Sequence, residues 1–191
     1  MAFLYKFCPK CGGRLLVQFT EGRDRQVCSA CGFIFYRNPI PAVAMIIRNG
    51  DGILLVRRKF EPRQGEWSLP AGFVEWGEAP DETAVREAKE ETNLDIKLSE
   101  LYGVFRARGE ENYEILLVVY RAEIVSGELQ AGDDALEARY FKFNALPENI
   151  AFRVHRQILN KLAKEAREAF KYFDGPGGLR PTVPERMPLP K

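Results

Sequence analysis

The segment REAKEETN places three carboxylates, Glu87, Glu90 and Glu91, within five positions and ends at Asn93. On a helix these side chains share an arc of about 100°, beside a stripe of small apolar residues. In water such crowding costs only a few tenths of a kcal/mol, so a solvated acidic face would account for it. Beside a core the repulsion is strong, and a divalent cation that prefers oxygen ligands relieves it. The pattern therefore indicates either a solvated helix face or a metal site.

The cysteines form a second chemical pattern, because all four lie near the start of the chain in two pairs of C-x-x-C spacing. They are Cys8, Cys11, Cys28 and Cys31. Two disulfides or two redox pairs are the alternatives. The gap between the pairs is typical of a four-thiolate zinc site, and a glycine follows each pair, which allows the tight turns that direct thiolates at one metal. Four protein ligands leave no open position, so we predict a structural Zn²⁺ that supplies the folding energy of a ribbon over residues 1–37.

The glutamates must be positioned by a domain that begins at about residue 38, after the prolines of YRNPIP. Two short apolar runs, 42–48 and 53–59, flank the sequence NGDG and predict a β-hairpin. Residues 59–73 are dense in proline and glycine and predict a loop. A helix is expected from about Ala79 to Glu91, because Pro80 suits its first position and acidic residues follow in its first turn.

Three further strands are expected at 101–107, 113–124 and 137–143, and a final helix from about Asn149 to Phe170. The domain over 38–173 is thus predicted to be α/β, with a mixed sheet. The last 18 residues, 174–191, are rich in proline and glycine and predict a flexible tail.

The totals exclude several classes of protein. With 191 residues and 46% hydrophobic content, one domain plus a small appendage can build a core. Lys and Arg number 28 against 27 Asp and Glu, so no overall field attracts nucleic acid or an acidic membrane. No apolar run approaches the ~20 residues of a membrane span, and the chain start lacks the pattern of a signal peptide. A cytoplasmic protein is expected.

A longer motif surrounds the glutamates. In GFVEWGEAPDETAVREAKEETNL, Gly72 precedes Glu78, and Arg86-Glu87 and Glu90-Glu91 follow at fixed intervals. This stretch resembles the Nudix box, and with the cysteine pairs the chain resembles Nudix hydrolases that carry an N-terminal zinc ribbon. Two positions depart from the pattern. Asn93 stands where the family has glycine, and Asn is the next best residue for a left-handed helix stop. Ala88 replaces a larger aliphatic residue and leaves every carboxylate in place.

The resemblance implies an α/β/α sandwich around a mixed sheet and hydrolysis of nucleoside diphosphate derivatives. It implies that Glu87 and Glu91 hold Mg²⁺ or Mn²⁺, that Glu90 is a further ligand or the base, and that Arg86 orients a carboxylate. The loop LPAG resembles that of ADP-ribose pyrophosphatases, in which the carbonyl at the position of Ala71 also binds metal.

Four further groups of residues have two interpretations each. The loop GDDALEARYF offers Asp133, Asp134 and Glu137 as a further acidic ligand; Glu137 is favoured among them, and a polar loop acid without a ligand role is the alternative. Arg58 ends its strand before the LPAG loop and is either a candidate for substrate phosphate or a surface arginine. Trp67 and Phe73 flank that loop, where aromatic residues more often join the core than stack on a base. His155, the single histidine, is expected to be solvated or to pack in the last helix.

The resemblance favours the branch that hydrolyses ADP-ribose and FAD, with AMP as one product. An NADH pyrophosphatase is disfavoured, because the Ser-Gln-Pro-Trp-Pro-Phe-Pro stretch of those enzymes is absent, and a dinucleoside polyphosphate pyrophosphatase is a further alternative. A third hypothesis is an RNA-binding protein, in which Arg14, Arg23 and Arg25 of the ribbon dock RNA on a Nudix scaffold. Its weakness is the intact carboxylate set. The expected partners are a small nucleotide substrate and, by the resemblance, a second copy of the chain.

Overall fold

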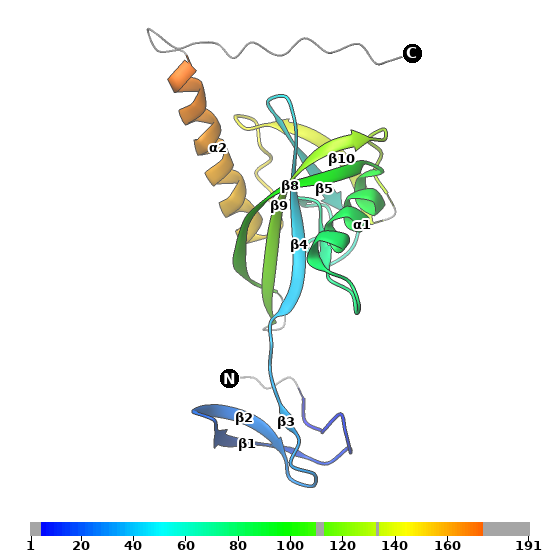
Figure 1. Cartoon of the computed structure of the whole chain (residues 1–191), viewed down its shortest axis with the longest axis vertical. Helices are drawn as coiled ribbons and strands as arrows, with labels where there is room; N and C mark the ends of the chain where they lie inside the picture. The colour runs from blue at the N-terminus through cyan, green and yellow to red at the C-terminus, as the bar shows by residue number, and fades with distance from the viewer. Residues whose placement is uncertain (1–4, 110–112, 133, 174–191) are drawn as a thin grey trace.

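The structure is a computed structural model, and it describes residues 5–109, 113–132 and 134–173, with the side chains of the last helix described as far as residue 168. The predicted tail, 174–191, and Asp133 lie outside this part of the chain. The ribbon holds three antiparallel strands in the order β1-β2-β3, namely β1 (Leu15–Thr20), β2 (Arg23–Cys28) and β3 (Ile34–Phe35). An extended segment then leads into the larger domain (Figure 1).

The larger domain is built on a mixed sheet in the order β10-β5-β4-β9-β8, to which β6 and β7 add as short partners of β5 and β4. Its elements are β4 (Ile40–Asn49), β5 (Gly52–Arg58), β6 (Trp67–Ser68), β7 (Ala71–Phe73), α1 (Pro80–Thr92), β8 (Asp95–Arg108), β9 (Glu114–Ser126), β10 (Ala135–Lys142) and α2 (Arg153–Phe173). Strands β4 and β9 run parallel, and the other named pairs of this sheet are antiparallel. The predicted hairpin of β4 and β5 is confirmed.

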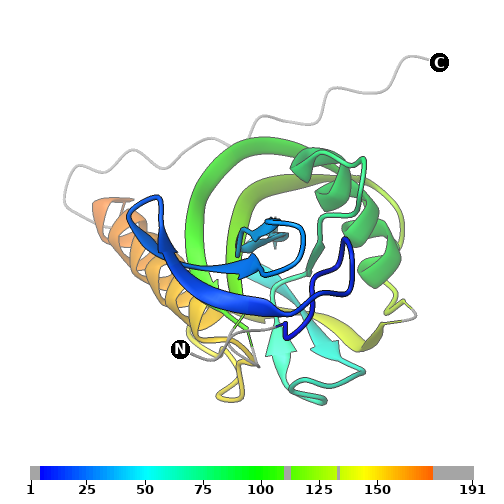
Figure 2. The same cartoon turned by 90° about the horizontal axis from the view of Figure 1, so that it is seen from below.

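The two helices cover opposite faces of the sheet, which is the predicted α/β/α arrangement (Figures 1 and 2). Alternate residues of β4 point to the two sides, as the pleat of a strand requires. Ala44 and Ile46 pack in the core cluster that includes Ile158 of α2, whereas Met45 packs with Ala88 of α1. The buried middle of β4, residues 42–47, therefore separates two cores, and each helix closes one of them.

Two boundaries differ from the sequence-based expectation. The loop over 59–73 contains the strands β6 and β7, which are held by backbone pairing rather than by a side-chain pattern. The last helix begins at Arg153 and not at Asn149, because the preceding segment is extended along Trp67. The Trp67 amide donates to the Asn149 carbonyl, and the Ala151 amide donates to the Trp67 carbonyl. No helix in the described part of the chain is long and apolar enough to cross a membrane.

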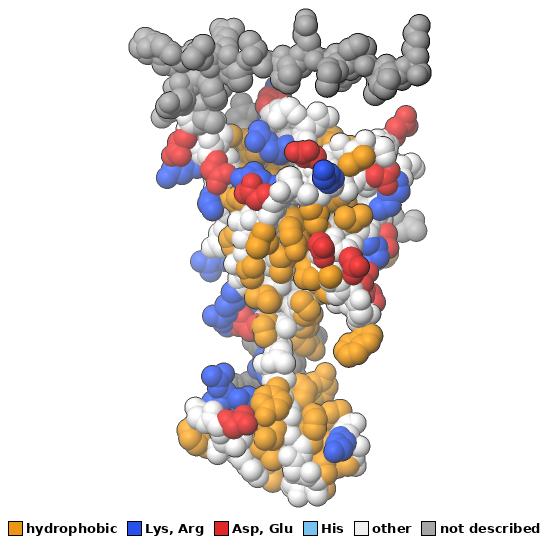
Figure 3. All heavy atoms as spheres, viewed as in Figure 1, with side chains coloured by type: hydrophobic (Ala, Val, Ile, Leu, Met, Phe, Trp, Pro, Cys, Tyr) orange, Lys and Arg blue, Asp and Glu red, His pale blue; other side chains and the backbone are white. Residues whose placement is uncertain are grey.

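Hydrophobic side chains remain exposed over part of the sheet in the view of Figure 3, and others lie on the ribbon. The exposed residues of β8 and β9 include Leu101, Val104 and Leu116, Phe73 at the end of the short strand β7 is exposed, and Trp76 follows that strand. Trp76 is fully exposed, so its ring is not part of the core.

Candidate metal centre and ribbon site

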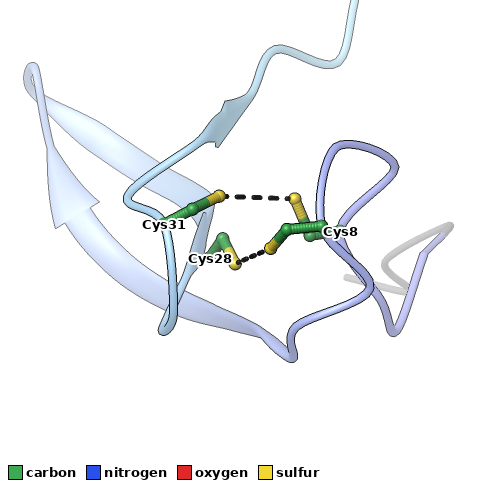
Figure 4. A group of neighbouring side chains, drawn as sticks. Cys8, Cys28 and Cys31 are labelled. Carbon is green, nitrogen blue, oxygen red and sulfur yellow. Dashed lines mark hydrogen bonds between the residues drawn. The ribbon is translucent and has the colours of Figure 1, made fainter.

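The four cysteines converge at one point of the ribbon, and their Sγ atoms all lie within 4.8 Å of one another. The Sγ atoms of Cys8 and Cys31 are 3.8 Å apart, and those of Cys11 and Cys28 are 3.5 Å apart (Figure 4). All four are free thiols. Tetrahedral ligands at a Zn–S distance of about 2.3 Å stand about 3.8 Å apart, so the spacing fits one metal ion. Disulfide sulfurs would be about 2.05 Å apart, which rules out the disulfide alternative in this structure.

Backbone amides around the cluster favour thiolates over thiols. The amides of Lys10 and Ala30 each lie 3.4 Å from a sulfur, that of Cys8 and that of Cys28. Backbone N–H groups of Cys31 and Ala30 lower the pKa of Cys28 to about 6. The thiolate is the form that binds metal, so the amides within each pair prepare Cys8 and Cys28 for a cation. Cys11 differs, because the Gly13 backbone lowers its pKa less than the Cys31 and Cys28 side chains and burial raise it, to about 12.

The carboxylate site is built by α1, whose ends are defined as the sequence predicted. Pro80 occupies the first turn, and the Glu82 carboxylate accepts a hydrogen bond from the Ala79 amide at 2.8 Å. At the other end Asn93 adopts φ 58°, and its amide donates to the Lys89 carbonyl. The interpretation of Asn93 as a left-handed helix stop is confirmed. These two ends place the glutamate face of α1 against β7.

Arg86 lies at the centre of the charged face. Its guanidinium contacts both oxygens of Glu78, at 2.6 and 2.9 Å, and also reaches Glu87 at 2.9 Å and Glu90 at 3.0 Å. The pKa of Glu78 is lowered to about 2, first by this arginine and then by the hydrogen bonds from Thr83 and the Glu75 amide. Arg86 therefore orients the carboxylates and fastens the loop before α1 to the helix.

Glu91 is the buried member of the cluster, with 9% of its surface exposed. Burial raises its pKa to about 8, although the Ala71 amide donates a hydrogen bond to its Oε2 at 2.9 Å. Burial also raises the pKa of Glu87. Glu90 differs, because 58% of its side chain is exposed. Two desolvated carboxylates one turn apart on a helix are the environment in which a divalent cation gains most.

The strand pairing directs the Ala71 carbonyl toward this site. The Met45 amide donates to the Pro70 carbonyl, so residues 45 and 70 form a hydrogen-bonded pair of the β4–β7 ladder. Along an antiparallel ladder, hydrogen-bonded pairs alternate with non-hydrogen-bonded pairs. Ala71 and Ala44 are opposite each other and form a non-hydrogen-bonded pair. The N–H and C=O of Ala71 then both point away from β4, and the N–H meets Glu91. The expected ligand carbonyl of Ala71 thus lies on the edge that faces the glutamates.

Gly72 is the residue that lets the loop approach the helix. A Cβ atom built on Gly72 would overlap the carboxylate of Glu87. The cradle formed by the LPAG loop and α1, with carboxylate and carbonyl oxygens as donors, fits a hard divalent cation. In the part of the chain that the structure describes, the cysteines are the group whose ligand atoms already stand at metal-binding distances, while Arg86 pairs with Glu87 and Glu90.

Gly72→Ala is therefore expected to lower metal affinity and activity by about tenfold to a hundredfold, with only a small change in stability. The reason is displacement of the Glu87 carboxylate. Isothermal titration with Mn²⁺ and the rate of hydrolysis measure the effect. Gly52→Ala, a strand glycine on the β4–β5 hairpin whose added Cβ would meet the Tyr140 Cβ at 3.2 Å, is the matched control. Equal losses in both variants would contradict this role of Gly72.

The other predicted site residues lie on β5, on β10 and in the loop before β10. Arg58 ends β5, where burial lowers its pKa and the charge of Glu91 acts against that shift. Glu137, on β10, forms an ion pair with Arg139 at 3.5 Å. Asp134 is the described acidic residue of the same loop whose charge raises the pKa of both Glu87 and Glu91. The spacing of the loop acids gave no means to rank Asp134 above Glu137.

Aromatic residues and the histidine complete the surroundings. Trp67 is buried and meets the ring of Phe141 edge to face at 4.7 Å, so it is a core residue, whereas Phe73 is exposed. His155 is 3% exposed, and its Nδ1 accepts a hydrogen bond from the Leu69 amide at 3.2 Å. Of the two expected roles, solvated or packed, it has the second. Its contact with the LPAG loop was not expected.

The burial of His155 predicts a pH dependence of stability. Its pKa falls from 6.5 to about 4, first because burial penalises the imidazolium and second because Arg58 lies near. A group with a lowered pKa stabilises the fold fully above its unfolded pKa, about 6.5, and loses this contribution as the pH falls toward 4. Urea denaturation should show that wild type loses up to about 3 kcal/mol more than His155→Asn between pH 7 and pH 4. If the free energies of unfolding of wild type and His155→Asn fall equally between pH 7 and pH 4, this prediction is wrong.

The comparisons with known proteins agree with this architecture. The family model described as NUDIX domain matches residues 38–162, and the zinc-ribbon model described as Nudix N-terminal matches residues 6–37. This chain belongs to the Nudix hydrolase family and carries the N-terminal ribbon found in part of it.

The individual relatives carry names of two different activities. The chain is 42% identical to an ADP-ribose pyrophosphatase of Methanocaldococcus jannaschii over 65% of this chain and 73% of that protein. It is 35% identical to the NAD-capped RNA hydrolase NudC of Pseudomonas aeruginosa over 74% of this chain, which spans about half, 49%, of that relative. A Nudix hydrolase structure from Nitrosomonas europaea superposes with a TM-score of 0.75 at 33% identity, covering 86% of this chain and 93% of the other.

Proposed function

We propose that this chain hydrolyses the pyrophosphate bond of nucleoside diphosphate derivatives with Mg²⁺ or Mn²⁺, and that ADP-ribose and FAD are its substrates. The observation that carries the proposal is the buried Glu91 of α1, which accepts a hydrogen bond from the Ala71 amide and lies one turn from Glu87. The name of the M. jannaschii relative favours ADP-ribose. Water adds its oxygen to a phosphorus atom and the bridging P–O bond breaks. The products are AMP and ribose 5-phosphate, or AMP and FMN.

The residues divide the work by their environment. Glu87, Glu91 and the Ala71 carbonyl would hold the divalent cation, which when bound would supply positive charge for the phosphate oxygens and lower the pKa of a water molecule. Glu90 is the exposed carboxylate and has the role of a further ligand or of the base that takes the proton of this water. Arg86 keeps Glu87 and Glu90 in place.

The substrate end of the site rests on Arg58 and on one loop acid. Arg58 is fixed by a hydrogen bond from its Nε to the Pro62 carbonyl at 2.8 Å and supplies positive charge near Glu91 for a phosphate. Glu137 stays a prediction as a ligand, and Asp134 is added to it on the electrostatic grounds given above. Structural Zn²⁺ in the ribbon, the division at residues 37 and 38, a cytoplasmic location and a homodimer belong to the same proposal.

The NudC relatives favour a second candidate substrate, an NAD-linked nucleotide or an NAD-capped RNA. A panel of ADP-ribose, FAD, NADH, diadenosine polyphosphates and an NAD-capped RNA, each with Mg²⁺, separates the candidates by kcat/KM. The proposal expects ADP-ribose or FAD to exceed the others by at least about tenfold. A preference for the capped RNA that is lost on charge reversal of Arg14, Arg23 and Arg25 would favour the NudC-like activity instead.

A further inference from the structure

His155 lies on the opposite side of the sheet from the glutamates, yet it contacts the loop that meets them. It belongs to α2, while Glu87 and Glu91 belong to α1 (Figure 1). Its Nδ1 accepts the hydrogen bond of the Leu69 amide at 3.2 Å, and both residues are buried, at 3% and 0% exposure. An acceptor at Nδ1 places the imidazole proton on Nε2, so the ring is neutral.

The turn from Leu69 to Ala71 is held at three successive backbone positions, each by a different element. The Leu69 amide is held by His155 of α2, the Pro70 carbonyl by the Met45 amide of β4 at 2.9 Å, and the Ala71 amide by Glu91 of α1 at 2.9 Å. One residue, Pro70, separates the contact with His155 from the carbonyl that the proposed function assigns to the metal. The Pro70 carbonyl and the Ala71 amide belong to one peptide group and fix its plane, and the pairing of Gly72 with Val43 of β4 holds the next peptide group, which carries the Ala71 carbonyl.

The ring of His155 is itself fixed, so it can act as a rigid support. Phe152 meets it edge to face at 5.3 Å, and the guanidinium of Arg58 lies over Phe152 at 5.0 Å. The imidazole therefore connects the candidate phosphate residue Arg58 and the metal-binding loop through one packed group. A side chain that only fills space at this position would not present an acceptor to Leu69.

We infer that His155 is a positioning residue for the metal centre: through the Leu69 amide it fixes the LPAG turn and aims the Ala71 carbonyl at the cation held by Glu87 and Glu91. The inference rests on the proposed function, since it needs a cation at that place. A buried amide left without an acceptor would be satisfied by rotation of the turn, which moves Ala71. Loss of His155 is thus expected to affect metal binding beyond its effect on folding.

Three variants separate positioning from stability. His155→Leu removes the acceptor with little change in apolar volume, and His155→Asn keeps an acceptor oxygen near the place of Nδ1. Leu162→Ala removes core volume two turns further along α2, at a residue that is 3% exposed, and serves as the control for stability alone. The full chain is used, with its ribbon zinc in place. Mn²⁺ binding is measured by electron paramagnetic resonance, and Mg²⁺ activation of hydrolysis is measured in parallel.

His155→Leu is expected to weaken Mn²⁺ binding by about tenfold or more and to raise the Mg²⁺ concentration for half-maximal activity in proportion. Its KM for substrate at saturating Mg²⁺ should change by less than about threefold. His155→Asn should recover most of the Mn²⁺ affinity, and Leu162→Ala should lower the melting temperature without a change in affinity. If His155→Leu binds Mn²⁺ as wild type does, the inference is wrong while the proposed function stands. If wild type binds no Mn²⁺ outside the ribbon, the proposed function fails.

Should His155→Leu fail to fold, wild type alone gives the answer by NMR. Saturation with Mg²⁺ is expected to shift the amide resonance of Leu69 and the Nδ1 resonance of His155, because a cation at the Ala71 carbonyl would polarise the hydrogen-bonded turn that joins them. The inference would be overturned if Mg²⁺ shifts the amide resonance of Ala71 but leaves the Leu69 amide and His155 Nδ1 resonances unchanged.

Discussion

Glu91→Gln is expected to make the metal-free protein more stable and the enzyme at least about a hundredfold slower. Burial raises the pKa of Glu91 to about 8, from an ordinary value of 4.5. A group whose pKa is higher in the folded than in the unfolded protein contributes most to folding stability below its pKa in the unfolded protein. This contribution is lost as the pH rises through its pKa in the folded protein. At pH 7 to 8 the wild-type carboxylate is therefore under strain from desolvation, and a neutral amide relieves it while still accepting the Ala71 hydrogen bond.

Addition of Mg²⁺ should reverse the order of the two melting temperatures. The cation binds the folded wild type and stabilises it by mass action, and it has lost a ligand in Glu91→Gln. Thermal unfolding at pH 7.5, once with EDTA and once with excess Mg²⁺, measures the melting temperature of each protein without and with the cation. Glu90→Gln is the comparison for stability, because its exposed side chain should leave the metal-free melting temperature nearly unchanged. A Glu91→Gln protein that stays active and gains as much stability from Mg²⁺ as wild type would contradict the metal assignment.

Cys28→Ser is expected to abolish zinc binding and to unfold the ribbon, with the larger domain left folded. In the described part of the ribbon, from residue 5 on, the buried apolar cluster contains Cys8, Leu15 and Cys28, with Phe33 and Phe35 against it, so packing alone is too small to hold three short strands. Structural zinc supplies about 10–16 kcal/mol of apparent binding free energy in such modules. The loss of one thiolate therefore outweighs every other change to this segment.

Zinc content by mass spectrometry should fall from one ion per chain to almost none. Amide hydrogen exchange should lose protection over residues 15–35 and keep it in β4 and β9. Ser29→Ala, whose hydroxyl contacts the Arg14 carbonyl in an exposed position, is the neighbouring control. A Cys28→Ser protein with a protected ribbon and one bound zinc would show that the four thiolates are not the ligand set.

The sequence predicted the parts of the site that depend on local chemistry. The resemblance to the Nudix box, which includes Gly72, indicated the site, and helix geometry alone placed Glu87, Glu90 and Glu91 on one face of α1. Asn93 was predictable as the helix stop for the same reason. The C-x-x-C pairs located the ribbon site, since each pair closes its own turn.

Contacts made by backbone atoms across the chain could not be predicted in this way. The strands β6 and β7 have two and three residues, and their pairing with β5 and β4 leaves no side-chain period to detect. The contact of His155 with Leu69 joins residues 86 positions apart. The choice between Asp134 and Glu137 depends on the fold of one loop over α1, where the Gly132 amide donates to the Glu91 carbonyl at 3.1 Å.

The most direct test of the account is hydrolysis of ADP-ribose by the purified chain, with AMP and ribose 5-phosphate measured by mass spectrometry. The account predicts that the two products form in equal amounts with Mg²⁺, and that they disappear with excess EDTA and in Glu91→Gln. It is contradicted if the zinc-loaded, folded protein cleaves neither ADP-ribose nor FAD, or if it cleaves them equally well after removal of Mg²⁺.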